Sequence, residues 1–336
     1  GGRTLVGTVD RTHTPMGGRL LRRWLAMPLK EIEEIVARHD IVETFTMHET
    51  ELYTLNDLLG GIGDLERIAS KVAMGRILPR EVVRMAGALQ QIAPVRELCE
   101  QIAVPPLQAL LAPLDTCHDL TEEITHSLLP SPANLGKGEV FAEGVSPELD
   151  ELRNLKNHSK EKLDEMLQHE IVRTGITNLK IGFNNVFGYY FEVRKTQTEL
   201  VPADWEQRQT LVQAARFINP ALKEFEKKIL GAEERILAIE DELFAKLRET
   251  LLGYVDTLQR NATLLAQIDV LASFATLALE KKWVRPEMDD SLALELDEVW
   301  HPVIADVLPT GTPYVPNTLH LHSEGEQIWM ITGPNM

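Results

Sequence analysis

Cysteine is scarce in this chain of 336 residues, which contains only Cys99 and Cys117. Two cysteines are too few for a disulfide framework, and they form no Cys-x-x-Cys pair, so we expect a reducing compartment. The longest apolar runs fall far short of the about 20 residues that a membrane-spanning helix needs, which argues against a transmembrane protein. No basic and apolar signal segment opens the chain. These absences lead us to expect a cytoplasmic protein.

Positive charge is also in short supply. The chain has 34 Lys and Arg against 51 Asp and Glu, a net charge of −17, and a pI near 5.1. An acidic total argues against a protein that binds nucleic acid over its whole surface, so any such contact requires a local basic patch. Hydrophobic residues make up 44% and charged residues 25%, which is ordinary for a globular protein. The length suggests about two or three domains.

The first part of the chain, to about Pro130, has helical periodicity. Thr14-Pro15 is typical of an N-cap followed by proline at the first helical position. Apolar residues then recur three and four positions apart until Pro28, which lacks the donor that a helix needs. Further glycines and prolines separate several more segments of the same kind. The pattern predicts a helical core.

Two longer helices are predicted in the middle of the chain. Ser146-Pro147 begins the first, which should reach about Ile171, and Asn219-Pro220 begins the second. Residues 222–250 would form a helix about 43 Å long with apolar residues spaced alternately by three and four, a heptad seam. The seam consists of Leu222, Phe225, Ile229, Ala232, Ile236, Ile239 and Leu243. We expect the two helices to pack antiparallel and to hold the segment between them at their tip.

The segment between these helices carries a strand signal. From Leu179 to Val193, aromatic and β-branched residues alternate, and Asn184-Asn185 suits a two-residue hairpin turn because asparagine tolerates positive φ. We expect Tyr189 and Phe191 to form the module's own core. Residues 171–219 hold six basic and four acidic side chains, so their net charge has the sign that phosphate contacts require. The sequence therefore predicts a small β-rich module with a weak positive excess.

The last region, from about Trp283, is predicted to form short strands separated by prolines. Its apolar run Ile328–Thr332 precedes Gly333, and a strand before glycine is one element of a phosphate-binding loop. That loop needs G-x-x-x-x-G-K-[ST], of which only the first glycine and the next three residues are present. By itself, this ending is an ordinary turn. In the same way His301, before a proline, is predicted to be a turn residue rather than a catalytic base.

Three smaller expectations concern the remaining polar and aromatic residues. His320 and His322 are predicted to lie on an exposed strand face, because no His/Cys cluster has zinc spacing. Taken alone, Tyr314 is predicted to be a loop residue packed on Trp300 or Trp329. Cys99 and Cys117 are predicted to be small core residues.

Several motifs in order resemble the MutS mismatch-repair family. Thr332–Met336 is similar to the start of its Walker A loop, and Tyr314–Asn317 to its aromatic-x-x-Asn stretch. Asp10–Leu29 resembles the start of its helical core, while Ile181–Val193 and Arg208–Leu211 resemble its clamp. The likeness extends over nearly the whole chain. Together these motifs are more specific than any one of them.

The resemblance implies a mainly α fold: a helical core with a long antiparallel helical arm, a small β-rich clamp at its tip, and a partial α/β start of an ABC-type ATPase at the C-terminus. The implied domains are the core or lever at 1–145, the ascending arm helix at 146–170, the clamp at 171–219, the descending arm helix and return to the core at 220–282, and the ATPase start at 283–336. We therefore expect a central fragment of a longer protein, truncated at the Walker A loop.

The function implied by the resemblance is DNA mismatch repair by a homodimeric ATPase that works with ATP and Mg²⁺ in the nucleoid. This part would clamp double-stranded DNA without sequence preference and couple the clamp to the ATPase, and a MutL-type protein is the implied repair partner. Alone it should hold no cofactor, metal or catalytic residue and should not hydrolyse ATP. The DNA-binding candidates are Lys180, Asn184, Asn185, Arg194, Lys195, Arg208, Gln209 and Gln213. The nucleotide-binding candidates are Tyr314, Thr332, Gly333, Pro334, Asn335 and Met336.

Two alternatives fit the same residues. One is a MutS paralogue that acts in recombination, which a Phe-x-Glu wedge upstream in the parent gene would exclude. The other is a coiled-coil structural scaffold without a nucleic-acid role. Asn185 and Gln207 stand where basic residues are common in the family, which weakens the positive character of the module.

Overall fold

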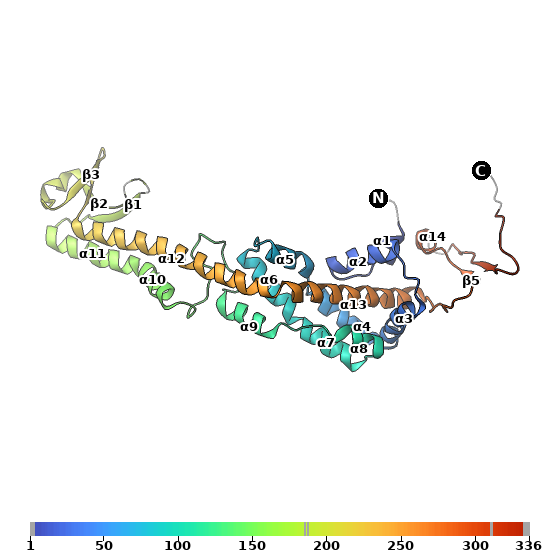
Figure 1. Cartoon of the computed structure of the whole chain (residues 1–336). Helices are drawn as coiled ribbons and strands as arrows, with labels where there is room; N and C mark the ends of the chain where they lie inside the picture. Colours follow the sequence, from blue (N-terminus) through green and yellow to red (C-terminus); the bar gives the residue numbers. More distant parts are fainter. Residues whose placement is uncertain (1–3, 185, 187, 310–311, 332–336) are drawn as a thin grey trace. The chain divides into compact units, whose positions relative to one another are not determined.

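The computed structural model describes residues 4–184, 186, 188–309 and 312–331. It is mainly α-helical with small antiparallel sheets, as expected (Figure 1). The helices are α1 Leu5–Val9, α2 Pro15–Ala26, α3 Ile32–Met47, α4 Glu49–Gly60, α5 Leu65–Ala73, α6 Pro79–Gln90, α7 Ile92–Gln101, α8 Pro105–Leu111, α9 His118–Ser127, α10 Pro147–Asn157, α11 Ser159–Thr174, α12 Pro220–Gly253, α13 Val255–Lys281 and α14 Pro302–Val307. The strands are β1 Lys180–Asn184, β2 Gly188–Arg194, β3 Glu206–Thr210, β4 Ala214–Ile218, β5 Leu294–Val299 and β6 Asn317–Leu321, and η1 Lys195–Leu200 is a 3₁₀ helix.

The chain divides into two compact units. The helical unit comprises residues 1–77, 84–121 and 251–336, and the sheet-bearing unit comprises residues 78–83 and 122–250. Each unit has its own apolar core.

Helix α13 is the central element of the helical unit, where it contacts α2, α3, α4 and α5. Its fully buried Asp269 accepts hydrogen bonds from the backbone N–H groups of His13 and Thr14, both at 2.8 Å, and from the Thr14 hydroxyl at 2.6 Å. The same hydroxyl accepts from the N–H of Gly17 at 2.9 Å, which confirms Thr14 as the N-cap of α2. A core carboxylate therefore fixes the entry into the first long helix.

By length and composition α13 also satisfies the criterion for a membrane-spanning helix, with a mean hydropathy of 1.7 in its most apolar stretch. It is the one such helix in the described part of the chain, and 72% of that stretch is buried inside the unit. The other helices of the unit therefore cover this apolar surface. Polar residues such as Asp269 and Ser273 interrupt the run, so the sequence shows no unbroken apolar stretch there.

The sheet-bearing unit contains two corrections to the predicted helices. The helix expected from Ser146 to about Ile171 is divided into α10 and α11 at His158, whose backbone leaves helical geometry (φ −86°, ψ 4°). Its N–H and its Nδ1 both lie about 3 Å from the carbonyl oxygen of Asn154, so it closes α10 before α11 begins. In contrast, α12 is one unbroken helix of 34 residues, about 51 Å long and longer than predicted.

The apolar seam of α12 departs from the predicted one at its C-terminal end. The predicted positions from Leu222 to Ile239 are buried or half-buried, but beyond them Phe244 is buried and Leu243 is only half-buried. A straight helix turns once every 3.6 residues, so a strict 3.5-residue repeat drifts around its surface. The seam therefore shifts by one position.

Charged side chains join α10 to α12. Arg235 pairs with Glu148 at 2.7 Å, and Lys156 pairs with Glu233 at 3.3 Å. Arg153 donates to the fully buried Glu240 at 2.7 Å. At the other end of these helices, Asn219 just before α12 donates to Glu170 near the end of α11 at 3.0 Å. The start of α12 thus lies beside the end of α11, whereas its later residues Arg235 and Glu240 meet α10, so α12 runs antiparallel to α10 and α11.

A four-stranded antiparallel sheet in the order β1-β2-β4-β3 connects α11 to α12. Asn184 pairs with Gly188, so the β1–β2 connection has three residues, 185–187, rather than the predicted two-residue Asn-Asn turn. The expected aromatic core is confirmed: Phe191 is fully buried and stacks on Trp205 at 4.6 Å, and the half-buried Tyr189 packs against the same cluster.

The region after Trp283 differs from the prediction of several strands. Strands β5 and β6 form a two-stranded antiparallel sheet, and α14 lies between them in sequence. The apolar run 328–331 is exposed and forms no strand within the described residues. A strand needs a partner for its backbone groups, and in the part of the chain that the structure describes β5 and β6 pair only with each other.

Candidate nucleic-acid interface

The two faces of the four-stranded sheet have opposite chemistry. Alternation along the strands directs Ile181, Phe191 and Phe217 into the apolar cluster that α11 and Leu222 of α12 complete. The register places four polar residues side by side on the other face, in a row that crosses all four strands. The row consists of Lys180, Glu192, Arg216 and Gln209.

Arg216 in this row is held within the sheet. Its Nη1 donates to Oε1 of Gln209 at 2.8 Å, and its Nε lies 3.7 Å from a carboxylate oxygen of Glu192. Its guanidinium also lies 4.2 Å from the ring centroid of Tyr190, a cation–π contact. The charge of Arg216 is therefore largely balanced before any ligand arrives.

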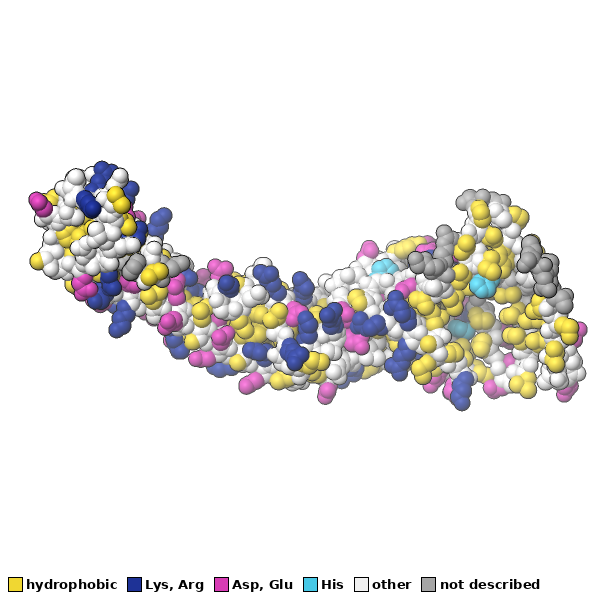
Figure 2. All heavy atoms as spheres, turned by 90° about the horizontal axis from the view of Figure 1, so that it is seen from above, with side chains coloured by type: hydrophobic (Ala, Val, Ile, Leu, Met, Phe, Trp, Pro, Cys, Tyr) yellow, Lys and Arg dark blue, Asp and Glu magenta, His cyan; other side chains and the backbone are white. Residues whose placement is uncertain are grey.

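The four basic candidates are in a different state. Lys180, Arg194, Lys195 and Arg208 are all exposed, and none forms an ion pair within the described residues. We call these four residues the free cations. The small net charge of the module therefore includes four basic side chains that form no ion pair within the described residues. Figure 2 shows dark-blue side chains on the sheet as well as along the helices.

The acidic side chains of the module are mostly paired with other bases. Asp204 pairs with Arg173 at 3.2 Å, and Glu206 pairs with Lys223 at 3.4 Å. Glu192 is the partner of Arg216, as described above. None of these three ion pairs involves a free cation, although Glu192 also lies directly opposite Lys180 in the register.

Strand direction brings most of the candidates to one end of the sheet. Lys180 begins β1, Arg194 ends β2, and Gln213 precedes β4, while Arg208 lies two residues before the end of β3. The N–H of Lys195 donates to the carbonyl oxygen of Gln213 at 3.1 Å, which joins two of the candidates directly. We call this the basic end of the sheet. Three free cations lie at strand ends there, and the fourth lies close to one.

Asn184, which was predicted for the same interface, lies elsewhere. Asn184 is at the opposite end of β1, about 13 Å from Lys180 at 3.3 Å per residue. Its Oδ1 accepts from the N–H of Val186 at 2.8 Å, so it stabilises the turn. Asn185 lies outside the described residues.

Sequence reasoning missed part of this interface, because it did not place residues 206–210 and 214–218 as strands. A β-bulge between Gln207 and Gln209 leaves Arg208 without a direct partner on β4. The alternation in Ala215, Arg216 and Phe217 was the available signal, but it is only a few residues long.

The nucleotide candidates are only partly described. Tyr314 stacks on Trp300 with ring centroids 5.0 Å apart and planes at 12°, and its hydroxyl accepts from the N–H of His301 at 2.8 Å. The expected packing on Trp300 is thus present, and His301 is the predicted turn residue because its Nδ1 caps α14 at the N–H of Ile304. Thr332, Gly333, Pro334, Asn335 and Met336 lie outside the described residues.

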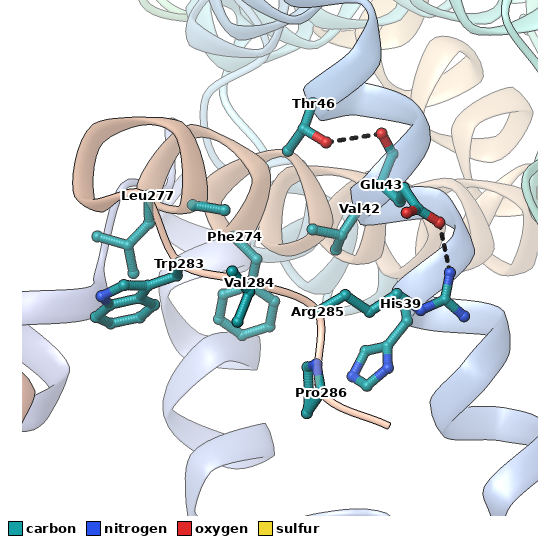
Figure 3. Close-up of a pocket in the computed structure, with 11 residues that line it drawn as sticks. His39, Val42, Glu43, Thr46, Phe274, Leu277, Trp283, Val284, Arg285 and Pro286 are labelled. Carbon is teal, nitrogen blue, oxygen red and sulfur yellow. Dashed lines mark hydrogen bonds and ion pairs between the residues drawn. The ribbon is translucent and has the colours of Figure 1, made fainter. Parts of the chain in front are cut away.

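A cavity of about 330 Å³ lies in the helical unit between α3, the end of α13 and residues 283–286 (Figure 3). Arg285 pairs with Glu43 at 2.6 Å and with Asp40 at 2.7 Å. Burial and then the nearby charge of Arg285 lower the pKa of His39 below its ordinary value. Since these charges balance one another, we assign the cavity a structural role, in which it anchors the segment after α13 to α3.

The remaining candidates have mixed outcomes: the cysteines are core residues as predicted, whereas only His320 lies in β6, where it is half-buried, and His322 follows the strand. Burial raises the pKa of both Cys99 and Cys117 to about 12, so both thiols are inert core groups. His320 and His322 lie beside Asp297 and Glu295 on the two-stranded sheet. The described residues contain no cluster of three or more His, Cys, Asp or Glu side chains suited to a metal ion.

Comparison with known proteins assigns the chain to a family. Residues 1–275 match the family model for MutS domain III. The chain belongs to the MutS family. It is 47% identical to the DNA mismatch repair protein MutS of Christiangramia forsetii over 334 residues, and 45% identical to that of Flavobacterium psychrophilum. These matches cover 99% of the chain but 38% and 39% of the two relatives, and the MutS of Porphyromonas gingivalis, 44% identical, is likewise covered over 38% of its length.

This MutS-family chain therefore spans under two-fifths of the length of the curated relatives it matches. The family model ends before the region with Tyr314. The alignment with the Porphyromonas gingivalis protein covers the whole chain, so it includes the sheet and the two-stranded region near the C-terminus.

Proposed function

We propose that this chain serves DNA mismatch repair and that its four-stranded sheet binds the backbone of duplex DNA. The observation that carries the proposal is the set of four free cations, three of them at the strand ends of the basic end. Lysine and arginine side chains that form no ion pair within the described residues are available to phosphate oxygens, and contacts of this kind position a duplex without reading its sequence. The names of the relatives support the repair context.

The roles of the individual candidates differ within this proposal. Lys180, Arg194, Lys195 and Arg208 would neutralise phosphates, while the exposed Gln213 would donate a neutral hydrogen bond. Gln209 would act mainly by holding Arg216, because its amide oxygen is already used. Asn184 would support the turn at the other end of the sheet and would not contact the same phosphates.

We further infer that α10, α11 and α12 form an arm that carries the sheet as a clamp. The unbroken α12 and the buried pair of Arg153 and Glu240 would make this arm stiff enough to relay a state of the longer protein to the clamp. In a longer homodimeric ATPase with a MutL-type partner, the relay would appear as nucleotide-dependent release of duplex DNA. Release rates that do not respond to nucleotide would contradict this role.

The described residues fit an ATP and Mg²⁺ site only in part. Tyr314 offers an aromatic ring for adenine, but Trp300 already stacks on it. The remaining nucleotide candidates lie outside the described residues, and no metal-binding cluster is found among those described. We therefore place the ATPase start at 283–336 as a proposal and derive no step of hydrolysis from it.

Salt titration of duplex binding tests the proposal. The 336-residue chain should bind a duplex of mixed sequence, and its affinity should fall steeply with salt because each neutralised phosphate releases counterions. Replacing Arg194 and Lys195 by Gln should reduce the slope of log K against log salt by about 1.8, at about 0.9 per phosphate. Lys246→Gln, which changes an exposed lysine of α12 outside the sheet, is the matched control and should leave the slope unchanged. An unchanged slope in the double variant would remove the basic end from the interface, and absence of duplex binding would favour a scaffold.

A further inference from the structure

The tip of the β3–β4 hairpin presents an exposed aliphatic side chain. The N–H of Leu211 donates to the carbonyl oxygen of Ala214 at 2.8 Å, which leaves Val212 and Gln213 as the connection. Val212 is 88% exposed. Hairpin connections usually use Gly, Asn, Asp or Pro, whose backbone preferences suit a turn. Valine has none of these backbone preferences, and an exposed side chain adds no packing to the module. The fold itself therefore does not explain a valine at this position.

The surroundings of Val212 are cationic. Gln213, its neighbour, accepts from the backbone of Lys195, and Arg194 is directly opposite Ala214 in the register. The same hairpin carries Arg208 on its first strand. An apolar tip therefore projects from the part of the sheet where the free cations gather.

The β1–β2 hairpin supplies an internal comparison. Val186 in its connection is 80% exposed, nearly as much as Val212. However, this hairpin is at the other end of the sheet, where Gly188 lies directly against the carboxylate of Glu226. A phosphate backbone would be repelled there. The two valines thus differ in electrostatic surroundings while sharing chemistry and exposure.

We propose that Val212 contacts the sugars and the groove wall of the duplex whose phosphates the free cations hold, an inference that rests on the proposed function. The sugars and base edges beside a phosphate present C–H groups, and removing them and the valine methyls from water is favourable. This contact releases no counterions, so its contribution is independent of salt, in contrast to that of the lysines and arginines. The basic end would therefore combine a charged, screened component with an apolar component that persists at high salt.

Salt titration separates these two components. Val212→Ser in the 336-residue chain should weaken duplex binding about three- to tenfold at every salt concentration without changing the slope of log K against log salt, as expected for partial burial of one aliphatic side chain. Lys195→Gln should instead reduce the slope by about 0.9. Val186→Ser is the matched control and should change neither quantity. Thermal unfolding of both serine variants should match the parent chain, because both side chains are exposed.

Each outcome decides between the two levels of the proposal. If Lys195→Gln reduces the slope while Val212→Ser binds like the parent chain, the apolar contact is wrong and the proposed function stands. Equal weakening by Val212→Ser and Val186→Ser would also overturn it, because the effect would not belong to the basic end. If Val212→Ser loses only binding to phosphatidylserine vesicles, the tip belongs to a membrane surface instead. If the chain binds no duplex, or if Lys195→Gln leaves the slope of log K against log salt unchanged, the proposed function fails and the contact fails with it.

Discussion

Helices α12 and α13 follow each other directly in the chain but are stabilised in different ways. α12 buries one stripe of apolar residues and exposes charged residues on its other sides. α13 is buried around most of its circumference by α2, α3, α4 and α5. A helix of the first kind needs only a matching apolar partner, whereas one of the second kind must also satisfy every polar group that it takes into the core.

The polar residues of α13 show how this requirement is met. Asn261 accepts from the N–H of Asp115 at 3.0 Å, and the Ser273 hydroxyl accepts from the N–H of Arg11 at 2.9 Å. Asp269 accepts the three bonds from His13 and Thr14 described above. Each buried polar side chain thus fixes the backbone of a distant segment. The position of α13 thus depends on hydrogen bonds between its buried polar side chains and distant backbone groups. α12 instead depends on its apolar stripe and has a single buried carboxylate, Glu240.

The largest expected effect on stability comes from removing the hydrogen bonds that Asp269 of α13 accepts from His13 and Thr14. Asp269→Ala should lower the free energy of unfolding by about 3 kcal/mol, because it leaves the part-buried N–H of His13 and the buried N–H of Thr14 without an acceptor. Urea unfolding monitored by circular dichroism measures the change. A loss below about 1 kcal/mol would mean that water or a shifted backbone replaces the carboxylate, and the contrast with α12 would weaken.

The same variant has a defined pH dependence. Burial, the largest influence, raises the pKa of Asp269 above its ordinary value of 3.8, although the bonds from Thr14 and His13 oppose it. The folded chain therefore keeps this proton at pH values where the unfolded chain has lost it. The stability of the parent chain relative to Asp269→Ala should be greatest below pH 3.8 and should decrease as pH rises through the raised value.

A smaller effect on stability is expected from adding a methyl group next to Asp269. A Cβ at Gly17 of α2 would overlap the carboxylate of Asp269, and Thr14 is also close. Gly17→Ala should therefore destabilise the chain by about 2 kcal/mol, even though alanine favours helix by about 1 kcal/mol. Thermal unfolding of Gly17→Ala beside the parent chain tests this. A variant as stable as the parent chain would show that the core around Asp269 yields readily.

The local signals of helix beginnings were readable from the sequence. Thr14, Ser146 and Asn219 were each predicted as N-caps, and each accepts from the N–H three residues later. A cap depends on a few neighbouring residues, and the proline after it fixes φ for the first turn. The mainly helical fold and the apolar seam of α12 were predictable for the same reason, because periodicity is local information.

The partners of charged and turn residues were not readable in this way. Nothing near Arg173 or Arg216 in the sequence shows that Asp204 and Glu192 will meet them, since the first pair depends on how α11 packs beside the turn before β3 and the second on sheet register. The break at His158 is equally hidden, because the sequence there contains no glycine or proline. The proposed interface thus rests on residues that the sequence already suggested. That the four basic ones form no ion pair with the described residues became visible only in the folded chain.

The smallest expected effect repeats the glycine substitution on α12. Gly231 lies inside this helix, and a Cβ there would meet no atom within 4 Å. Gly231→Ala should therefore stabilise the chain by about 0.5–1 kcal/mol, because alanine loses less conformational entropy than glycine in a helix. The measurement is the urea midpoint, taken beside that of Gly17→Ala. Opposite signs for the same chemical change would show that α12 responds to helix propensity and α13 to the fit of its neighbours, whereas equal signs would remove the distinction.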